Sequence, residues 1–397
     1  MVRAVTPAAR VAAAIDLLGR ILAGAPAERV LTTWARANRY AGSGDRAAIR
    51  DHVFDALRCR RSYGWLGGSD SGRGLMIGAL LASGTDPNTL FTGEKFAPEP
   101  LDADERRHAQ RATLADAPRA VRLDCPDWLL PAFDAALGRH SDAVLASLRR
   151  RAPVFLRVNL RKADRDAAGA ALRAEGIETR PHPLSKTALE VTANARRLAR
   201  AAAYRDGRVE LQDAASQAVV EALPLQGRAS VLDYCAGGGG KALAIAARTG
   251  ARVHAHDGDP RRLKDLPARA RRAGADIAVH ASEGLRGKAF DLVLCDVPCS
   301  GSGAWRRSPD AKWRLNPERL ARLTATQDAI LDRARGHVRA TGVLALVTCS
   351  LLRCENEQRV AAFLSRHDGW RLAFQRRLSP RDGGDGFFVA LLERENV

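Results

Sequence analysis

Short apolar segments alternate with segments of helical periodicity over the second half of the chain, and this alternation restricts the fold more than any other feature. The segments predicted to be strands are residues 230–234, 253–257, 277–279, 291–295 and 343–347. Strands that alternate with helices form parallel sheets joined by right-handed crossovers. We therefore predict a mostly parallel, doubly wound α/β sheet within residues 205–397.

The first half of the chain has a different pattern. Apolar residues in 11–22 recur at helical spacing, and Asp45 is placed to cap a further helix. Residues 154–159 and 188–191 are strand candidates. The expected parts are an all-α domain at 1–70, a helical connector at 71–146 and a small α+β unit at 147–204.

The chain is strongly basic, with 63 Lys+Arg against 45 Asp+Glu and a formal net charge of +18. A genomic bias explains why arginine replaces lysine, but not why positive charge exceeds negative charge. Such an excess favours nucleic acid as a partner, because neutralised phosphates release counterions. Arg46, Arg50, Arg58 and Arg157 are candidate contacts, although a solvated surface position is the simpler interpretation for each one alone.

Several classes of protein are disfavoured. No stretch of about 18 uninterrupted apolar residues exists, so we expect no transmembrane helix and no membrane partner. The Ala-rich first 20 residues lack a clean signal-peptide core. The seven cysteines form no dense disulfide framework, and no CxxC pair or His cluster indicates a metal site. We expect a cytoplasmic, monomeric protein without a metal.

A glycine-rich segment follows the first predicted strand of the large sheet. Its residues are Cys235, Ala236, Gly237, Gly238, Gly239, Gly240 and Lys241. Glycines let the backbone turn sharply and approach a ligand, and the next helix offers free N–H groups. Asp257 ends the second strand, where a carboxylate can accept ribose hydroxyls or cap the following helix. The spacing matches neither phosphate fingerprint, and S-adenosyl-L-methionine fits it at least as well as NAD.

Two cysteines follow the fourth and fifth predicted strands. Asp296 and Cys299 come after the fourth, and Cys349 after the fifth. Because the carboxyl ends of neighbouring parallel strands line one crevice, we expect these three side chains to converge beside the glycine segment. Cysteine is often merely buried and inert, which is our interpretation of the others. These are Cys59, Cys125, Cys235, Cys295 and Cys354.

This set suits one particular reaction. C5 of cytosine is a poor nucleophile towards a methyl sulfonium. A thiolate that adds to C6 makes C5 nucleophilic, and an acid near N3 assists the addition. A base then removes the C5 proton and the thiol is eliminated. One cysteine, one carboxyl group and a second group that aids release are the minimum parts.

The motifs together resemble those of the Sun/RsmB family of RNA (cytosine-5) methyltransferases. They are Gln212-Asp213, Ser216-Gln217, Asp233 through Lys241, Asp257, Asp296 through Gly303, Arg307, Pro309, Asp310, Trp313, Thr348-Cys349-Ser350 and Glu355-Asn356-Glu357. More weakly, 44–58 resembles the NusB-like domain of the RsmB branch, and 155–159 its small RNA-recognition unit. The resemblance implies a Rossmann-like class I methyltransferase domain at 205–397, S-adenosyl-L-methionine as cofactor and small-subunit ribosomal RNA as partner.

The resemblance also implies a role for each site residue. Cys349 would be the nucleophile, Cys299 would assist release, and Asp296 would contact the base and the methionine end of the cofactor. Residues 235–241 would hold the methionine part, and Asp257 the ribose.

Two departures from the family stand out. The usual Ala-Pro-Gly-Gly-Lys-Thr is replaced by Ala-Gly-Gly-Gly-Gly-Lys-Ala at 236–242, which loses a proline and a hydroxyl. The Asp after the third strand is absent, and Ser282 or Glu283 is the candidate replacement near the adenine. Two other functions remain open. One is a non-catalytic RNA-binding ribosome-assembly factor with a degenerate methyltransferase domain, and the other a nicotinamide-dependent oxidoreductase.

Overall fold

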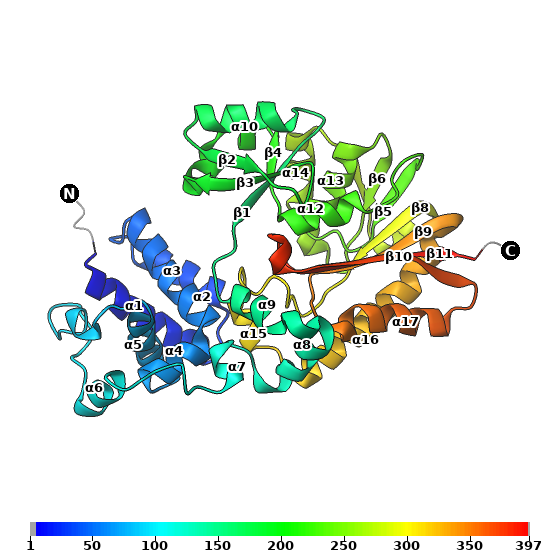
Figure 1. The fold of residues 1–397 in the computed structure, drawn as a ribbon. Helices are drawn as coiled ribbons and strands as arrows, with labels where there is room; N and C mark the ends of the chain where they lie inside the picture. The colour runs from blue at the N-terminus through cyan, green and yellow to red at the C-terminus, as the bar shows by residue number, and fades with distance from the viewer. Residues whose placement is uncertain (1–4, 396–397) are drawn as a thin grey trace. The chain divides into compact units, whose positions relative to one another are not determined.

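A seven-stranded sheet organises the C-terminal part of the computed structural model, which describes residues 5–395 (Figure 1). The strand order is β10-β11-β9-β8-β5-β6-β7, and the five strands from β9 to β7 run parallel. This confirms the predicted parallel-rich, doubly wound sheet. Its strands are β5 (Ser230–Asp233), β6 (Arg252–Ala255), β7 (Ile277–Val279), β8 (Phe290–Asp296), β9 (Val338–Thr348), β10 (Trp370–Leu378) and β11 (Phe387–Arg394).

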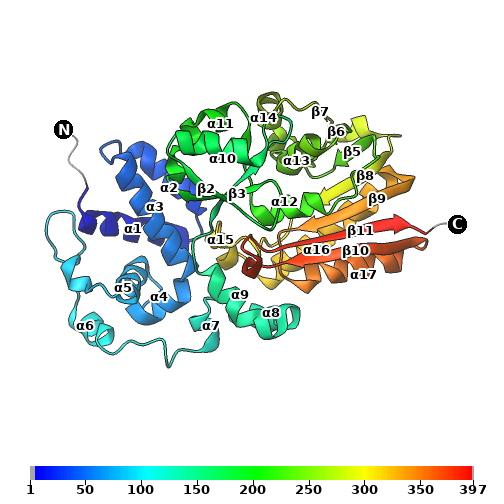
Figure 2. The same cartoon turned by 45° about the horizontal axis from the view of Figure 1, so that its top comes forward.

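Helices cover both faces of this sheet because successive strand residues point to opposite sides. Leu292 and Leu294 of β8 join the hydrophobic core beneath α12 and α13, whereas Val293 and Cys295 join the core beneath α16 and α17. Figure 2 shows these helix pairs on the two sides of the sheet. The helices are α12 (Ala214–Glu221), α13 (Gly240–Arg248), α14 (Leu266–Ala273), α16 (Pro317–Ala334) and α17 (Glu357–Arg366).

Two strands at one side of the sheet were absent from the five predicted from sequence, the edge strand β10 and its neighbour β11. β11 pairs antiparallel with β9, and β10 pairs antiparallel with β11, so neither follows the strand–helix alternation. β11 is buried along most of its length, and an apolar run of this kind cannot be told from a buried helix by periodicity. β10 is an arginine-rich edge with mostly exposed residues, which removes the alternation typical of a strand.

A four-stranded antiparallel sheet, in the order β2-β3-β1-β4, precedes the large one. Its elements are β1 (Val154–Val158), α10 (Arg165–Ala174), β2 (Glu178–Pro181), β3 (Ala188–Ala193), α11 (Ala202–Arg205) and β4 (Val209–Leu211). The predicted small α+β unit was placed at 147–204. β4 lies beyond residue 204 and pairs with β1, so a division at that residue runs through the small sheet.

The N-terminal part is helical. Its helices are α1 (Pro7–Leu22), α2 (Ala27–Ala37), α3 (Ser43–Arg58), α4 (Arg60–Gly67), α5 (Gly72–Ala82), α6 (Ala103–Ala109), α7 (Arg119–Arg122), α8 (Leu130–Leu137) and α9 (Ser141–Leu148). Asp45 was expected to cap α3 from the preceding position. Instead α3 begins at Ser43, and the Asp45 carboxylate reaches back to the backbone N–H of Gly42 and pairs with Arg10. An acid in the first turn suits the helix dipole.

A short segment from the C-terminal half belongs to this helical unit, which ends at Arg151 and also contains Trp305–Leu315 with α15 (Pro309–Trp313). Lys312 Nζ donates to the backbone oxygens of Arg58 and Asp124, and Trp313 Nε1 donates to that of Leu57. The carbonyls of Leu57 and Arg58 lie at the end of α3, where no further turn of that helix would bond them, and the carbonyl of Asp124 lies just after α7. Burial lowers the pKa of Lys312 to about 8. No pattern in the sequence assigned this segment to the N-terminal unit.

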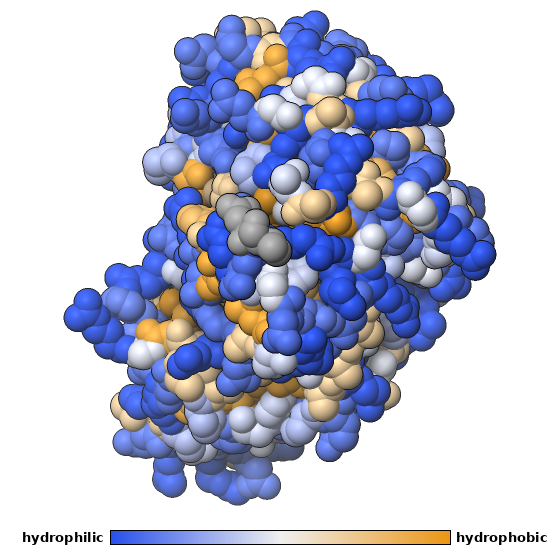
Figure 3. All heavy atoms as spheres, turned by 90° about the vertical axis from the view of Figure 1, so that its right-hand side faces the viewer, coloured by the Kyte–Doolittle hydropathy of each residue, from blue (hydrophilic) through white to orange (hydrophobic). Residues whose placement is uncertain are grey.

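No helix in residues 5–395 is long and apolar enough to cross a membrane. The face of the molecule in Figure 3 is mostly hydrophilic, and its hydrophobic residues form small, separate areas.

Candidate active site

The glycine segment lies between β5 and α13, at the carboxyl edge of the parallel strands. Gly237 and Gly239 adopt left-handed backbone conformations, with φ of 51° and 79°. A Cβ on Gly239 would lie 2.1 Å from Leu266 Cδ1, so a larger residue would both strain the backbone and clash. The segment therefore passes close to α14, and its last backbone N–H groups lie at the N-terminus of α13.

Asp257 supports this segment from the end of β6. Its Oδ2 accepts the Gly237 N–H at 2.9 Å, and its Oδ1 accepts the Asp259 N–H at 2.9 Å. Arg262 Nη1 lies 3.1 Å from the same carboxylate. The carboxylate is buried against the glycine segment, and Asp259, not Asp257, caps the turn that begins at Pro260, so the alternative of a helix cap is wrong for Asp257.

Ser282 is connected to the neighbouring strand ends. Buried His256 contacts Ser282 Oγ through Nε2 at 3.0 Å and the Tyr234 carbonyl through Nδ1 at 2.8 Å. Glu283 follows Ser282 and is exposed. Of the two candidate replacements for the missing Asp, Ser282 is thus the one joined to the ends of β5 and β6.

Lys241 and Asp296 form an ion pair, with Nζ 2.7 Å from Oδ2. Lys241 belongs to the first turn of α13 and is buried, whereas Asp296 ends β8 and is partly accessible. Burial lowers the pKa of Lys241, but the Asp296 carboxylate outweighs this effect and leaves the pKa raised. Both residues were predicted to belong to the site, but their pairing was not predicted.

Asp233, the last residue of β5, is a buried acid behind this pair. Neither of its carboxylate oxygens has a partner that meets hydrogen-bond geometry among residues 5–395. Burial, followed by the charge of Asp296, raises the pKa of Asp233 to about 7, and Lys241 and the Ala242 amide offset the shift only in part. Asp233 had no role predicted from sequence. A buried carboxyl group with a raised pKa and no hydrogen-bond partner, at the end of a strand, is common in functional sites.

Replacing Asp233 with asparagine is expected to stabilise the chain at pH 8. The folded state binds this proton more tightly than the unfolded state, whose pKa is about 3.8. Ionisation therefore costs folded-state stability as the pH rises from about 4 to 7, on the order of 4 kcal/mol in total. In urea unfolding, the free energy of unfolding of Asp233→Asn should exceed that of wild type at pH 8, and the difference should shrink towards pH 4.

The matched control is Asp276→Asn, the same change at an exposed position in the same part of the chain. It should alter stability little at either pH. A stability difference for Asp233→Asn that is the same at pH 4 and pH 8 would contradict the assignment of its raised pKa.

The two predicted cysteines meet at the ends of β8 and β9. Cys299 Sγ lies 3.4 Å from Cys349 Sγ, and both residues are partly accessible. The hydrogen bond with Cys349, together with burial, raises the pKa of Cys299 well above its usual value. Cys299 therefore keeps its proton at neutral pH and can donate it to the neighbouring sulfur.

The other five cysteines lie apart from this pair. Cys59, Cys125, Cys235 and Cys295 are buried and Cys354 is partly buried. Burial raises the pKa of every one of them, as expected for thiols that are inert.

A buried carboxylate fixes the two cysteine-bearing loops to each other. Glu355, which is 0% exposed, accepts hydrogen bonds from Ser300 N and Oγ in one loop and from Ser350 Oγ in the other. Gln327 Nε2 donates both to Glu355 and to the Pro298 carbonyl. The residues next to both cysteines therefore share one anchor.

Asn356 and Glu357 extend this support. Asn356 accepts from Thr348 Oγ1 and donates to the Ser350 carbonyl at 2.9 Å, which spans the Cys349 turn. Glu357 pairs with Arg377, which also donates to the Leu351 carbonyl. From sequence, this Glu-Asn-Glu run was only part of the resemblance to the family. The only signal in the sequence for a supporting role was that these polar residues follow the Thr-Cys-Ser motif after four intervening residues.

Two of the four arginines proposed as RNA contacts are buried and structural. Arg58 Nε donates to the Arg306 carbonyl within the helical unit. Arg157 donates to Gln212 Oε1 and, at 2.7 Å, to the Gly240 carbonyl, and burial lowers its pKa to about 9. Neither is available to RNA, nor is either on the solvated surface. The sequence shows that a residue is arginine, but not whether backbone carbonyls already accept the hydrogen bonds of its guanidinium group.

Residues 5–395 contain no group of three or more His, Cys, Asp or Glu side chains arranged to hold a metal ion. The site therefore consists of the glycine segment with Asp257, the Lys241–Asp296 pair beside Asp233, and the Cys299–Cys349 pair on its Glu355 anchor. These groups can bind a nucleoside ligand, provide a proton and a nucleophile, and stabilise a departing thiolate.

Two family models match the chain. Residues 220–393 match the model for the 16S rRNA methyltransferase RsmB/F, and residues 125–196 match that for the ferredoxin-like domain of RsmF/B-like methyltransferases. Ribosomal RNA small subunit methyltransferase B of Xylella fastidiosa strain 9a5c is 35% identical over 311 residues, 73% of this chain and 72% of the relative. That of Photorhabdus laumondii is 33% identical over 287 residues, 68% of this chain and 66% of the relative, about two thirds of its length.

Solved structures share the fold. PH0851 covers 98% of this chain and 99% of its own, with a TM-score of 0.75 and 20% identity. NSun6 from Pyrococcus horikoshii, solved with SFG, covers 68% of this chain and 99% of its own, with a TM-score of 0.58 and 17% identity. At these identities the likeness concerns the fold alone.

Proposed function

Because the chain belongs to the RsmB/F family of 16S rRNA methyltransferases, we propose that it methylates C5 of a cytidine in small-subunit ribosomal RNA. The methyl donor is S-adenosyl-L-methionine, and the reaction passes through a covalent bond between Cys349 and C6 of the base. The observation that carries the proposal is the pair of thiols 3.4 Å apart at two adjacent strand ends.

The residues at the glycine segment fit the proposed cofactor. Gly237 and Gly239 hold left-handed backbone conformations that a Cβ would strain, and the Asp257 carboxylate accepts the Gly237 N–H directly beside them. We assign residues 235–241 to the methionine part and Asp257 to the ribose, with Ser282 towards the adenine. The bound cofactor supplies an electrophilic methyl group on a sulfonium.

The chain's own groups prepare the base and release it. Cys349 forms the bond to C6, so that the electron density needed for reaction develops at C5. Asp296 is partly accessible and accepts a hydrogen bond from the Lys241 ammonium, so a proton passes from Lys241 through the Asp296 carboxyl to N3 as Cys349 adds to C6. After methyl transfer a base takes the C5 proton, and the electron pair of that C–H bond expels the Cys349 thiolate. Cys299 retains its proton because its pKa is raised, and its hydrogen bond stabilises the Cys349 thiolate as the bond to C6 breaks.

The target cytidine has to leave its stack to reach these groups, because a stacked base cannot present both C5 and C6 to them. The excess of basic residues supports a polyanionic substrate, whose phosphates position it without fixing its sequence.

The proposal is tested with radiolabelled S-adenosyl-L-methionine and unmodified small-subunit rRNA. Label should appear in 5-methylcytidine after digestion to nucleosides. RNA that binds but acquires no label, offered both free and in assembling particles, would favour the non-catalytic assembly-factor alternative. Label in a nucleoside other than 5-methylcytidine would contradict the two-cysteine chemistry.

A further inference from the structure

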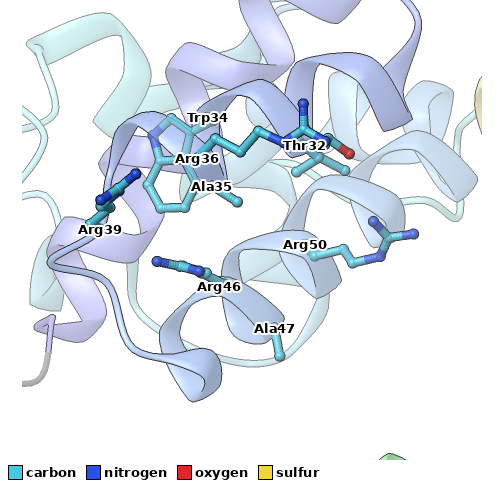
Figure 4. A pocket seen from close by; sticks show the side chains of 9 residues that line it. Thr32, Trp34, Ala35, Arg36, Arg39, Arg46, Ala47 and Arg50 are labelled. Carbon is cyan, nitrogen blue, oxygen red and sulfur yellow. The ribbon is translucent and has the colours of Figure 1, made fainter. Parts of the chain in front are cut away.

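A basic pocket lies between α2 and α3 of the helical unit (Figure 4). Its volume is about 510 Å³, within the range of pockets that hold small ligands and large enough for one nucleotide. The lining contains Trp34 and four arginines, Arg36, Arg39, Arg46 and Arg50, and no acidic residue. It therefore presents positive charge and an aromatic ring in one concave surface.

Three of the four arginines carry no counter-charge from the described part of the chain, residues 5–395. Arg50 is paired with Glu28 and stacks over Phe54. In contrast, Arg36 and Arg39 are exposed and form no ion pair with any of residues 5–395. Arg46 also lacks an acidic partner. Its Nε is buried without a hydrogen-bond partner, and its Nη2 reaches only the Asn38 carbonyl, at 3.5 Å. A ligand that brings negative charge would satisfy all three.

Aromatic side chains accompany these cations. Trp34 packs partly against the core of the helical unit, and Figure 4 shows its indole and the Arg46 guanidinium facing the same space from α2 and α3. Tyr40, in the loop between those helices, is 61% exposed. Uncompensated arginines beside available aromatic faces are the features with which proteins bind single-stranded nucleic acid.

We propose that this pocket binds a single-stranded RNA segment, with a base stacked on Trp34 and phosphates held by Arg36, Arg39 and Arg46. An acidic peptide would satisfy the charges but give the Trp34 face no partner, and a duplex would keep its bases stacked away from it. Single-stranded DNA offers the same stacking and phosphates, so only the choice of RNA rests on the proposed function.

Fluorescence anisotropy of a short, labelled, single-stranded oligoribonucleotide with the full chain tests the proposal in the absence of cofactor. Trp34→Leu keeps apolar packing but removes the aromatic face, and it should weaken binding about tenfold. Trp34→Phe should recover most of that loss. The double variant Arg36→Gln/Arg39→Gln should flatten the slope of log K against log salt by about 1.4, which corresponds to two phosphates on a single strand.

The matched control is Arg111→Gln/Arg122→Gln, which removes two exposed charges of the same unit outside the pocket and should leave that slope unchanged. An equal change of the salt slope in this control, or wild-type RNA affinity in Trp34→Leu, would contradict RNA binding by this pocket. Tighter binding of an RNA duplex or of a glutamate-rich peptide would contradict the choice of single-stranded nucleic acid as ligand. Equal binding of single-stranded DNA of the same sequence would contradict the choice of RNA over DNA.

This assay needs no methyl transfer, so its failure is distinguishable from failure of the proposed function. Pocket effects as expected, in a chain that never methylates rRNA, would refute only the proposed function. Active methylation with no pocket effects would refute only the pocket.

Discussion

Replacing Cys349 with alanine is expected to abolish methyl transfer, by at least about 10⁴-fold in kcat, because no other group can form the bond to C6. Cys299 is 3.4 Å away, but its raised pKa keeps it a thiol, and a thiol is a far weaker nucleophile than a thiolate. RNA binding should remain. Methyl transfer is measured with saturating RNA and cofactor, and RNA affinity separately by filter binding.

Cys354→Ala serves as the matched control for this change. Cys354 lies in the same region, is partly buried, and burial raises its pKa to about 11. Its loss should leave methyl transfer within about twofold of wild type, because a surface-near thiol with no assigned role contributes little to stability or chemistry. Substantial methylation by Cys349→Ala would identify a different nucleophile.

The second large effect is expected at Glu355. Glu355→Ala removes the acceptor for Ser300 N, Ser300 Oγ and Ser350 Oγ, in the interior of the protein. Buried donors that lose this charged acceptor should cost about 3–5 kcal/mol of unfolding free energy in total. That corresponds to a fall of roughly 10 °C in Tm for a unit of this size. Calorimetry measures the change.

Glu355→Gln separates the effect of Glu355 on the position of the two cysteine loops from its effect on the free energy of unfolding. It keeps one acceptor oxygen and the side-chain volume, so we expect a loss of about 1–2 kcal/mol. Methyl transfer should still fall by about tenfold or more at a temperature where the variant is fully folded, because small displacements of reacting groups are costly. A stable Glu355→Gln chain with wild-type kcat would show that the anchor does not position the cysteines.

The order of strands and helices set how much of the fold could be predicted. The five parallel strands each follow or precede a helix, so residues near β5 to β9 gave clear apolar segments. β10 and β11 pair antiparallel at the edge, which this alternation does not anticipate. The membership of Trp305–Leu315 in the helical unit depends on contacts of Lys312 and Trp313 with residues far away in the sequence.

The site was predictable where topology alone brings residues together. The ends of adjacent parallel strands meet at one edge, and this was enough to expect Cys299, Cys349 and Asp296 in one crevice. The two thiols do meet, and Asp296 pairs with Lys241 at the start of α13. The unpartnered state of Asp233 could not be predicted, since it depends on which donors surround it. The burial of Arg157 could not be predicted either, because its guanidinium donates to a carbonyl of the glycine segment that is distant in sequence.

The division of labour between the two thiols is the central claim, and trapping the covalent intermediate tests it most directly. Cys299→Ala should accumulate a protein–RNA adduct that survives denaturing electrophoresis, because the departing Cys349 thiolate loses its hydrogen-bond donor. Peptide mass spectrometry should place the RNA on Cys349, and the double variant Cys299→Ala/Cys349→Ala should form none. An adduct that persists in the double variant, or that maps to another residue, would contradict the account.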